Sequence, residues 1–173
     1  MALTFQLISS STLGSNQSSF AFTSIPATYT DLYVMASLRD ATSGSSLLSV
    51  RNSINNSASA IYSTTQIISS GTSMTGSRVA DGTTMYAGAM MGNGAPVNYY
   101  SALDWYIPNY LISQNRQTMI TQSNVSSEVN TNQTTLVAGL YRDATVITSL
   151  QFNPNGQTFK TGSSFYLYGI KKS

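Results

Sequence analysis

The 173-residue chain contains no cysteine and no histidine. Without cysteine it has no disulfide, no thiolate nucleophile and no cysteine metal ligand. Without histidine it lacks the imidazole base of Ser-His-Asp and Cys-His enzymes, and also the most frequent zinc ligand. These two absences exclude the commonest forms of nucleophilic catalysis and of transition-metal binding.

Charge is also scarce, because only 8% of the residues are charged, against about a quarter in an ordinary soluble protein. The net charge is +2, and the arginines are isolated at positions 39, 51, 78, 116 and 142. Nucleic-acid binding needs clustered basic side chains that neutralise phosphates, so we expect no nucleic-acid partner. Ser, Thr, Asn and Gln occupy 72 of the 173 positions, so the polarity comes from neutral groups.

Long apolar runs and clustered acids are missing as well. The chain has no run of 18 apolar residues, which a membrane-spanning helix would need. Its first ten residues, MALTFQLISS, lack the basic start of a signal peptide. Glycoside hydrolysis needs two neighbouring carboxyl groups and calcium needs several, whereas the six acidic residues are scattered. We therefore expect no membrane association, no enzymatic activity, no metal and no cofactor.

What the chain has is apolar residues at every second position. The alternation is clearest in 29–39, 134–142, 145–152 and 163–170, where it predicts half-buried antiparallel strands. Shorter candidate strands are 2–8, 18–22, 46–54, 59–68, 83–90, 99–107 and 116–123. Clusters rich in Gly, Ser, Asn and Pro separate them, among them 71–77 and 91–96, which predict turns.

This pattern covers the chain without an evident linker or a helical stripe. About ten short strands with regular turn signals are typical of β-sandwiches. We predict an all-β fold with one domain, residues 1–173, built as a single antiparallel β-sandwich of jelly-roll type.

The low charge also predicts self-association. Free β proteins usually protect their sheet edges with charged side chains, and this chain has three Lys, all after residue 159, and one Glu. We expect a homo-oligomer, specifically a trimer; the alternative is a neutral, Ser/Thr-rich monomer kept soluble by its hydroxyl groups. Candidate interface residues are Leu3, Phe5 and Leu7, in a segment that could add a strand to a neighbour's sheet or serve as the first strand of its own, and Met90 and Met91, in a Gly-rich stretch that favours a contact loop.

A second candidate site is the aromatic stretch between residues 99 and 110. Aromatic rings beside Asp or Asn side chains are typical of sugar-binding sites, which makes Tyr100, Asp104, Trp105 and Tyr110 candidate glycan contacts. Trp105 and Tyr106 point to opposite faces of a strand, so half of the set at most can line one site. The other interpretation is that these rings belong to the hydrophobic core.

Several segments of the chain resemble a known family. They are Phe20–Pro26 (FAFTSIP), Tyr29–Leu32 (YTDL), Ile107–Tyr110 (IPNY), Ala138–Tyr141 (AGLY), Ala144–Leu150 (ATVITSL) and Phe165–Ile170 (FYLYGI). In this order they resemble small virion structural proteins of tailed phages, common in cyanophages and other aquatic phages. The resemblance covers about residues 18–39 and 102–170, and the region 43–100 lies outside it.

The resemblance implies an all-β module on the virion surface, assembled in the cytoplasm of a bacterial host. Members of this kind serve as capsid decoration (cement) proteins or as parts of tail fibres and spikes. We therefore expect a capsid decoration protein whose partners are the major capsid protein or other virion proteins. The alternative is a receptor-binding module of a tail fibre or spike that recognises a glycan on the host surface.

Overall fold

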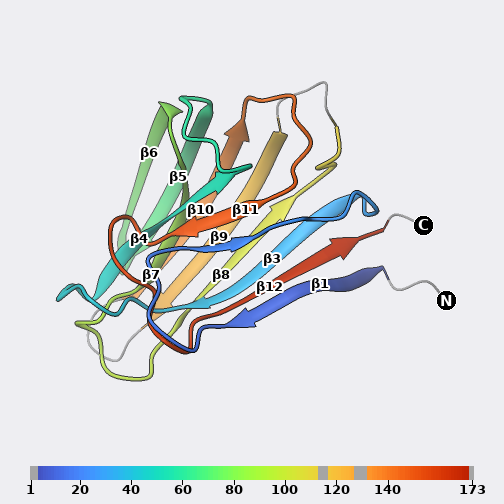
Figure 1. Ribbon diagram of the computed structural model, residues 1–173. Helices are drawn as coiled ribbons and strands as arrows, with labels where there is room; N and C mark the ends of the chain where they lie inside the picture. Colours follow the sequence, from blue (N-terminus) through green and yellow to red (C-terminus); the bar gives the residue numbers. More distant parts are fainter. Residues whose placement is uncertain (1–3, 113–116, 127–131, 172–173) are drawn as a thin grey trace.

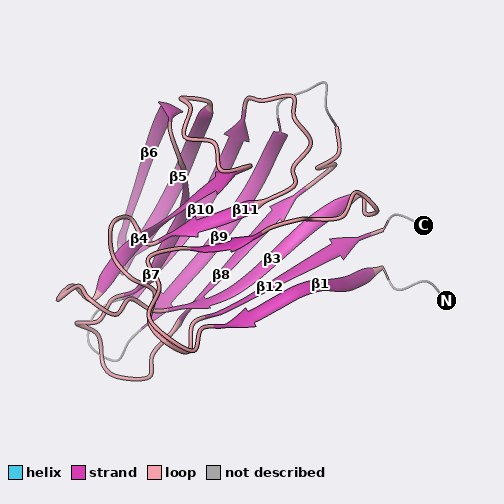
Figure 2. Ribbon diagram, in the orientation of Figure 1, coloured by secondary structure: helices cyan, strands magenta, loops and turns pink. Residues whose placement is uncertain are grey.

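The structure, a computed structural model, describes residues 4–112, 117–126 and 132–171 (Figure 1). The described residues form strands joined by loops and turns, with no helix (Figure 2). No described segment is therefore a helix of the length and apolarity needed to cross a membrane. The strands are β1 (Phe5–Thr12), β2 (Phe20–Phe22), β3 (Asp31–Leu38), β4 (Leu47–Ile54), β5 (Tyr62–Ser70), β6 (Ser73–Gly82), β7 (Met85–Met91), β8 (Ser101–Ile107), β9 (Gln117–Ser126), β10 (Asn132–Tyr141), β11 (Leu150–Asn153) and β12 (Ser164–Ile170).

The strands form two antiparallel sheets that pack face to face. The large sheet has eight strands in the order β1-β12-β3-β8-β9-β10-β5-β6, and the small sheet has four in the order β2-β11-β4-β7. In Figure 1 the small sheet crosses in front of the large one. The predicted all-β antiparallel sandwich is confirmed, while the jelly-roll connectivity stays a prediction.

Two segments differ from the sequence prediction. Residues 145–149, the first part of the predicted strand 145–152, form a loop before β11, and the backbone of Thr148 bonds to Ile25 and to the Asn55 side chain. The cluster 71–77 predicted a turn, but most of it belongs to β6, which pairs with β5 from Ser73 to Gly82. Both faces of β6 are exposed up to residue 81, so neither face needs an apolar stripe. The prediction was wrong because alternation marks only strands that bury one face.

The core lies between the two sheets and is rich in aromatic rings. Trp105 of β8 packs edge-on against Phe152 of β11, with ring centroids 5.6 Å apart. Phe165 of β12 contacts both Phe152 and Phe159, and it stacks on Phe20 of β2 at 4.1 Å. These contacts between sheets explain the alternation in 101–107 and 164–170, since every second residue enters this core.

Strand β7 is buried on both faces and packs against β8, β9 and β10. Its small residues permit the close approach. A Cβ atom at Gly88 would lie 2.3 Å from the Ser123 hydroxyl, and the φ of 140° at Gly88 is one that other residues rarely adopt. On the free edge of β7, serine side chains of the large sheet accept hydrogen bonds from backbone N–H groups. Ala89 N donates to Ser123 Oγ at 2.8 Å, and Met91 N donates to Ser101 Oγ.

Candidate functional site: the outer face of the large sheet

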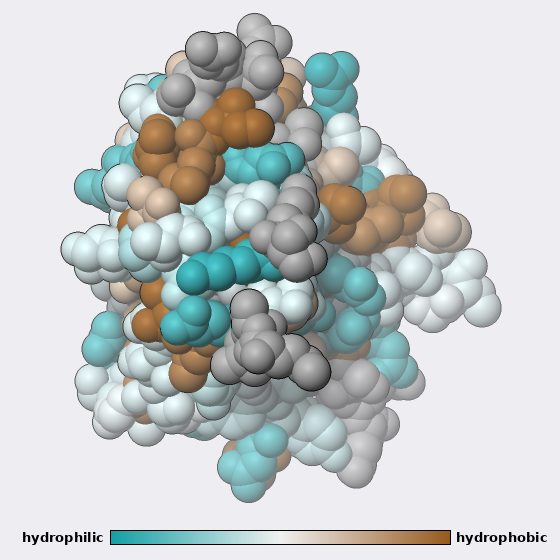
Figure 3. All heavy atoms as spheres, turned by 90° about the vertical axis from the view of Figure 1, so that its right-hand side faces the viewer, coloured by the Kyte–Doolittle hydropathy of each residue, from teal (hydrophilic) through white to brown (hydrophobic). Residues whose placement is uncertain are grey.

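In β3, β8, β9, β10 and β12, buried residues alternate with residues that point away from the small sheet. We call the surface that the second set forms on the large sheet the outer face. Most of the large apolar side chains that the described residues expose lie on it: Phe5, Leu7, Met35, Ile67, Met74, Ile120, Leu136 and Tyr166. Figure 3 shows the side of the molecule that is on the right in Figure 1, where apolar patches are separated by polar atoms.

A row of tyrosines crosses one half of the outer face. Tyr168, Tyr33 and Tyr106 lie directly opposite one another on β12, β3 and β8. The ring of Phe5, on the neighbouring β1, meets Tyr33 edge-on at 6.0 Å and Tyr168 at 6.4 Å. Aromatic pairs on adjacent strands stabilise a sheet, and here they also place phenol groups on the outer face.

Two carboxylates accompany the tyrosines. Tyr106 donates its hydroxyl to Asp31 Oδ2 at 2.9 Å, and the backbone N–H of Asn109 donates to Asp31 Oδ1 at 2.8 Å. Burial, followed by the Asp31 carboxylate, raises the pKa of Tyr106. Burial and the neighbouring Asp104 likewise raise the pKa of Tyr33. Both phenols therefore stay protonated at neutral pH, as hydrogen-bond donors.

A groove of about 580 Å³ is hollowed into the other half of the outer face. Ala138, Ile120 and Leu140 supply apolar lining, Ser63 and Thr65 supply hydroxyl groups, and the guanidinium of Arg78 lies at the β6 side. The charged residues in the described strands of the large sheet are Asp31, which is buried, and Arg78, Asp81 and Asp104. The outer face therefore carries few charges and mixes apolar with neutral polar side chains.

The predicted interface residues fall into two groups. Phe5 and Leu7 are half exposed on β1, at the edge of the large sheet, whereas Leu3 lies outside the described residues. β1 pairs with β12 of its own chain, so this segment is the first strand of its own sheet. Met90 and Met91 are fully buried in β7, so the prediction of a Met-bearing contact loop was wrong. Their strand is covered on both faces by segments distant in sequence, which local composition does not reveal.

The four candidate glycan contacts do not come together on the surface. Trp105 and Tyr110 are buried in the core, with exposed fractions of 0% and 1%. Tyr100 lies at the edge of the core, where its hydroxyl donates to the backbone oxygen of Thr161. Asp104 alone lies on the outer face, beside Tyr33. The core interpretation therefore holds for Trp105 and Tyr110.

The tyrosines of the outer face were not among the predicted contacts, because the tryptophan that suggested a binding site lies on the inner side of β8. The alternation contained the necessary signal, since Tyr33, Tyr106, Tyr166 and Tyr168 all occupy positions between buried residues. Within the residues that the structure describes, no three His, Cys, Asp or Glu side chains gather where they could hold a metal ion. No protein-family model matches the chain, and no curated protein matches it significantly.

Proposed function

We propose that the chain is a structural protein of a tailed-phage virion that decorates the outside of the capsid as a homo-oligomer and stabilises it without covalent bonds. The observation that carries this proposal is the outer face, with its exposed apolar and tyrosine side chains and few charges. Clusters of exposed apolar side chains are typical of interaction surfaces. Charged residues are depleted at the centres of protein interfaces, where Tyr and Met are enriched.

The proposed mechanism needs no catalytic group. A decoration protein holds neighbouring capsid subunits together through shape-matched neutral contacts, each of them weak. Many copies on one shell then act together, because each bound copy raises the effective concentration of its neighbours' contacts. The major capsid protein is the proposed partner, the virion surface the proposed location, and assembly takes place in the cytoplasm of the bacterial host.

Binding to capsids tests the proposal directly. Purified protein added to undecorated shells should bind in high copy and raise the temperature at which the shells break. Ile120→Lys, which places a charge on the outer face, should weaken this binding at least tenfold. Val97→Lys is the matched control, since Val97 is also an exposed apolar residue but lies in a loop away from the outer face. A protein that leaves the shells unbound, or loses binding equally in both variants, contradicts the proposal.

A second candidate function is recognition of a host-surface glycan by a tail-fibre or spike module. The tyrosine row and the neighbouring groove with its hydroxyl groups and Arg78 favour it, because protein sites for sugars combine aromatic rings with polar groups. The number of copies per virion separates the two functions. Hundreds of copies indicate capsid decoration, whereas a few dozen or fewer indicate the tail.

A further inference from the structure

The four edges of the two sheets differ in how they are protected from other chains. An edge strand presents unpaired backbone groups, which natural proteins block with short strands, bulges, charges or covering segments. β2 has only three residues. β1 carries an irregularity between Leu7 and Ser9 that disturbs its free edge. On the free edge of β7, the hydroxyl groups of Ser101 and Ser123 accept hydrogen bonds from two backbone N–H groups.

Among the described residues, β6 is the edge that has no such protection over Ser73–Val79. Its ten residues, Ser73–Gly82, pair with β5 on one side, and both of its faces are exposed. From Ser73 to Val79 its register with β5 is regular, and this stretch ends at a bulge, where residues 80 and 81 lie opposite the single residue 63. These seven residues include no Pro, Lys or Glu, and Arg78 is their one charged residue.

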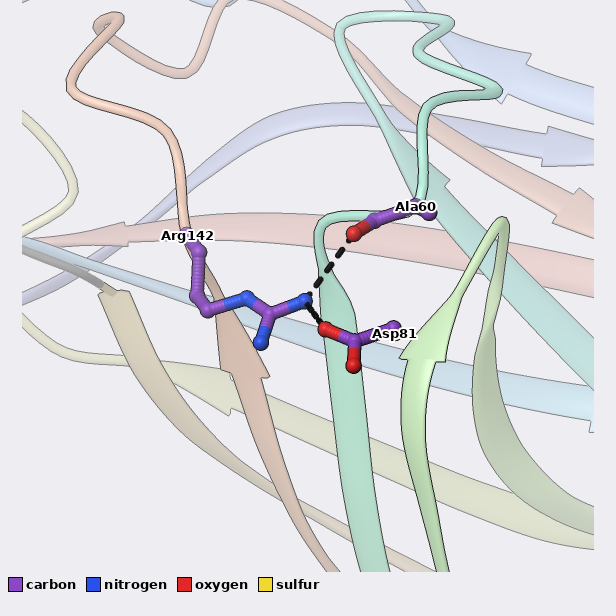
Figure 4. A network of polar contacts seen from close by, with 3 residues as sticks. All are labelled: Ala60, Asp81 and Arg142. Atoms are coloured by element: carbon purple, nitrogen blue, oxygen red, sulfur yellow. Dashed lines mark hydrogen bonds and ion pairs between the residues drawn. The ribbon is translucent and has the colours of Figure 1, made fainter.

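The hairpin that carries β6 is fixed at its base. Arg142, at the end of β10, donates a hydrogen bond to the backbone oxygen of Ala60 at 2.9 Å and forms an ion pair with Asp81 (Figure 4). Ala60 precedes β5 and Asp81 lies near the end of β6, so one guanidinium group ties both strands to the sheet. A strand held in this way needs little ordering when a partner strand binds to it.

We propose that β6 pairs antiparallel with β6 of a second copy of this chain, about a two-fold axis at Gly76. This inference rests on the homo-oligomer of the proposed function and names the surface through which two copies meet. The two large sheets then continue as one across the contact. Seven residues from each copy would exchange about six to eight backbone hydrogen bonds, since alternate pairs in an antiparallel ladder make two each.

Charge selects the register. With Gly76 on the axis, the regular stretches 73–79 of the two copies overlap completely, and Arg78 lies opposite Met74 of the partner subunit. A register centred on Arg78 would place two guanidinium groups directly opposite each other, which is unfavourable. The chosen register instead lets the aliphatic part of Arg78 cover the exposed side chain of Met74.

A second copy is the occupant that this edge fits best, because the contact is complementary to itself. A two-fold contact pairs each residue with a residue of the same strand, so equal length and equally low charge are guaranteed on both sides. The contact by itself is small compared with the interface of a stable dimer, which buries about 800 Å² per partner. We therefore expect a weak pair in solution that becomes strong when many copies lie side by side on one shell.

Single cysteines test the register. The chain contains no native cysteine, so Gly76→Cys introduces a unique thiol. Opposite Cα atoms of an antiparallel pair are about 4.5–5.5 Å apart, within the range that a disulfide spans. Under mild oxidation Gly76→Cys should become a covalent dimer of twice the monomer mass. Ser10→Cys, on the exposed edge strand β1, is the matched control and should stay monomeric.

Opposite charges test the two-fold axis. A side chain at Gly76 fits the monomer, because a Cβ atom there would meet only the Gln66 backbone oxygen, at 3.7 Å. In Gly76→Lys the two lysines would face each other, and in Gly76→Glu the two glutamates would. Each variant alone should lose dimerisation at least tenfold in sedimentation equilibrium, whereas a mixture of the two should recover it. Ser10→Lys should behave like the wild type.

The outcomes distinguish this inference from the proposed function. A Gly76→Cys chain that resists oxidation, a Lys/Glu mixture that does not associate, or wild-type trimers unchanged by Gly76→Lys would overturn the β6 contact. Such a result, combined with wild-type binding to shells, would leave the decoration function standing. If the dimer forms as described but the shells stay unbound, the β6 contact holds and the decoration function fails.

Discussion

The large sheet has two unlike halves. The half that contains β3, β8 and β12 has one face against the small sheet, and half of its side chains are buried in the core. At the other end β6 buries neither face, although it has the same backbone pairing with its neighbour. The β6 end is therefore held mainly by backbone hydrogen bonds to β5, whereas the half with β8 is stabilised by side chains that pack in the core. We therefore expect substitutions in the two halves to act on different quantities, stability in one and association in the other.

The largest expected effect lies in the packed half. Trp105→Ala should lower the free energy of unfolding by about 3–5 kcal/mol, because it empties a fully buried site beside Phe152. Met74→Ala on β6 should change it by less than about 0.5 kcal/mol, since that side chain is exposed. Urea unfolding of the two variants measures the difference. Equal losses would mean that β6 contributes to the core as β8 does.

Trp105→Phe sharpens this prediction. The indole Nε1 of Trp105 is buried and has no hydrogen-bond partner in the structure. A phenylalanine keeps most of the ring contact and removes this unsatisfied donor, so it should cost clearly less than alanine. A loss as large as that of Trp105→Ala would show that the indole nitrogen does have a partner.

An intermediate effect is expected at alkaline pH, from Tyr62 at the start of β5. Its buried hydroxyl accepts a hydrogen bond from Ile54 N at 2.9 Å and lies 3.2 Å from the backbone oxygens of Ile54 and Ser57, to which it donates. Burial raises the pKa of Tyr62 from 10.0 to about 12. Below pH 10 the phenol is protonated in both states. Between pH 10 and 12 the unfolded chain loses this proton first, so stability falls by roughly 2 kcal/mol.

The free energy of unfolding measured from pH 9 to 12 checks this sign. Tyr62→Phe is the control, because it removes the titrating group and should flatten the slope in this window. Burial also raises the pKa of Tyr141 and Tyr86, so part of the slope should remain. Identical slopes in the two proteins would contradict the assignment to Tyr62. At neutral pH, Tyr62→Phe should itself cost about 1–3 kcal/mol, because buried backbone groups lose their partner.

The smallest expected effect lies at the exposed half. Asp81→Asn removes the ion pair with Arg142, which is worth about 0–1 kcal/mol because Asp81 is largely exposed. Global unfolding should barely change, whereas hydrogen exchange of the β5 and β6 amides should become several times faster. Asp104→Asn, a change of the same kind on β8, should leave those amides unaffected. Protection of β6 that survives Asp81→Asn would show that the ion pair does not hold the hairpin.

The same contrast explains which parts of the molecule the sequence predicts. Leu32, Val34 and Leu38 alternate with outward residues because one face of β3 meets the core, and so this strand could be predicted. β6 has no buried face and leaves no periodic signal. Met90 and Met91 lie in a strand covered on both faces, and its cover comes from segments distant in the sequence. A strand that buries one face, such as β3, shows its alternation in the sequence, whereas β6 shows none; β7 was expected as the strand 83–90, but its burial on both faces was not.

The candidate site was predictable only in part, for the same reason. Phe5 and Leu7 were correctly expected in an alternating strand, and Asp104 was expected beside aromatic rings. Which aromatic rings accompany Asp104 depends on the order of the strands, because Tyr33 comes from β3 and lies about seventy residues earlier in the chain. Local spacing carries no information on that neighbour.

The hydrogen bonds from backbone N–H groups of β7 to two serine hydroxyls affect how the molecule unfolds. Ser101 and Ser123 belong to one layer, and the amides that they satisfy belong to the other. Separating the layers would break these hydrogen bonds and expose the apolar side chains of the shared core to water, so a detached four-stranded layer would lose most of its stabilising contacts. Heating should therefore melt both layers in a single transition, with the calorimetric enthalpy equal to the van't Hoff enthalpy.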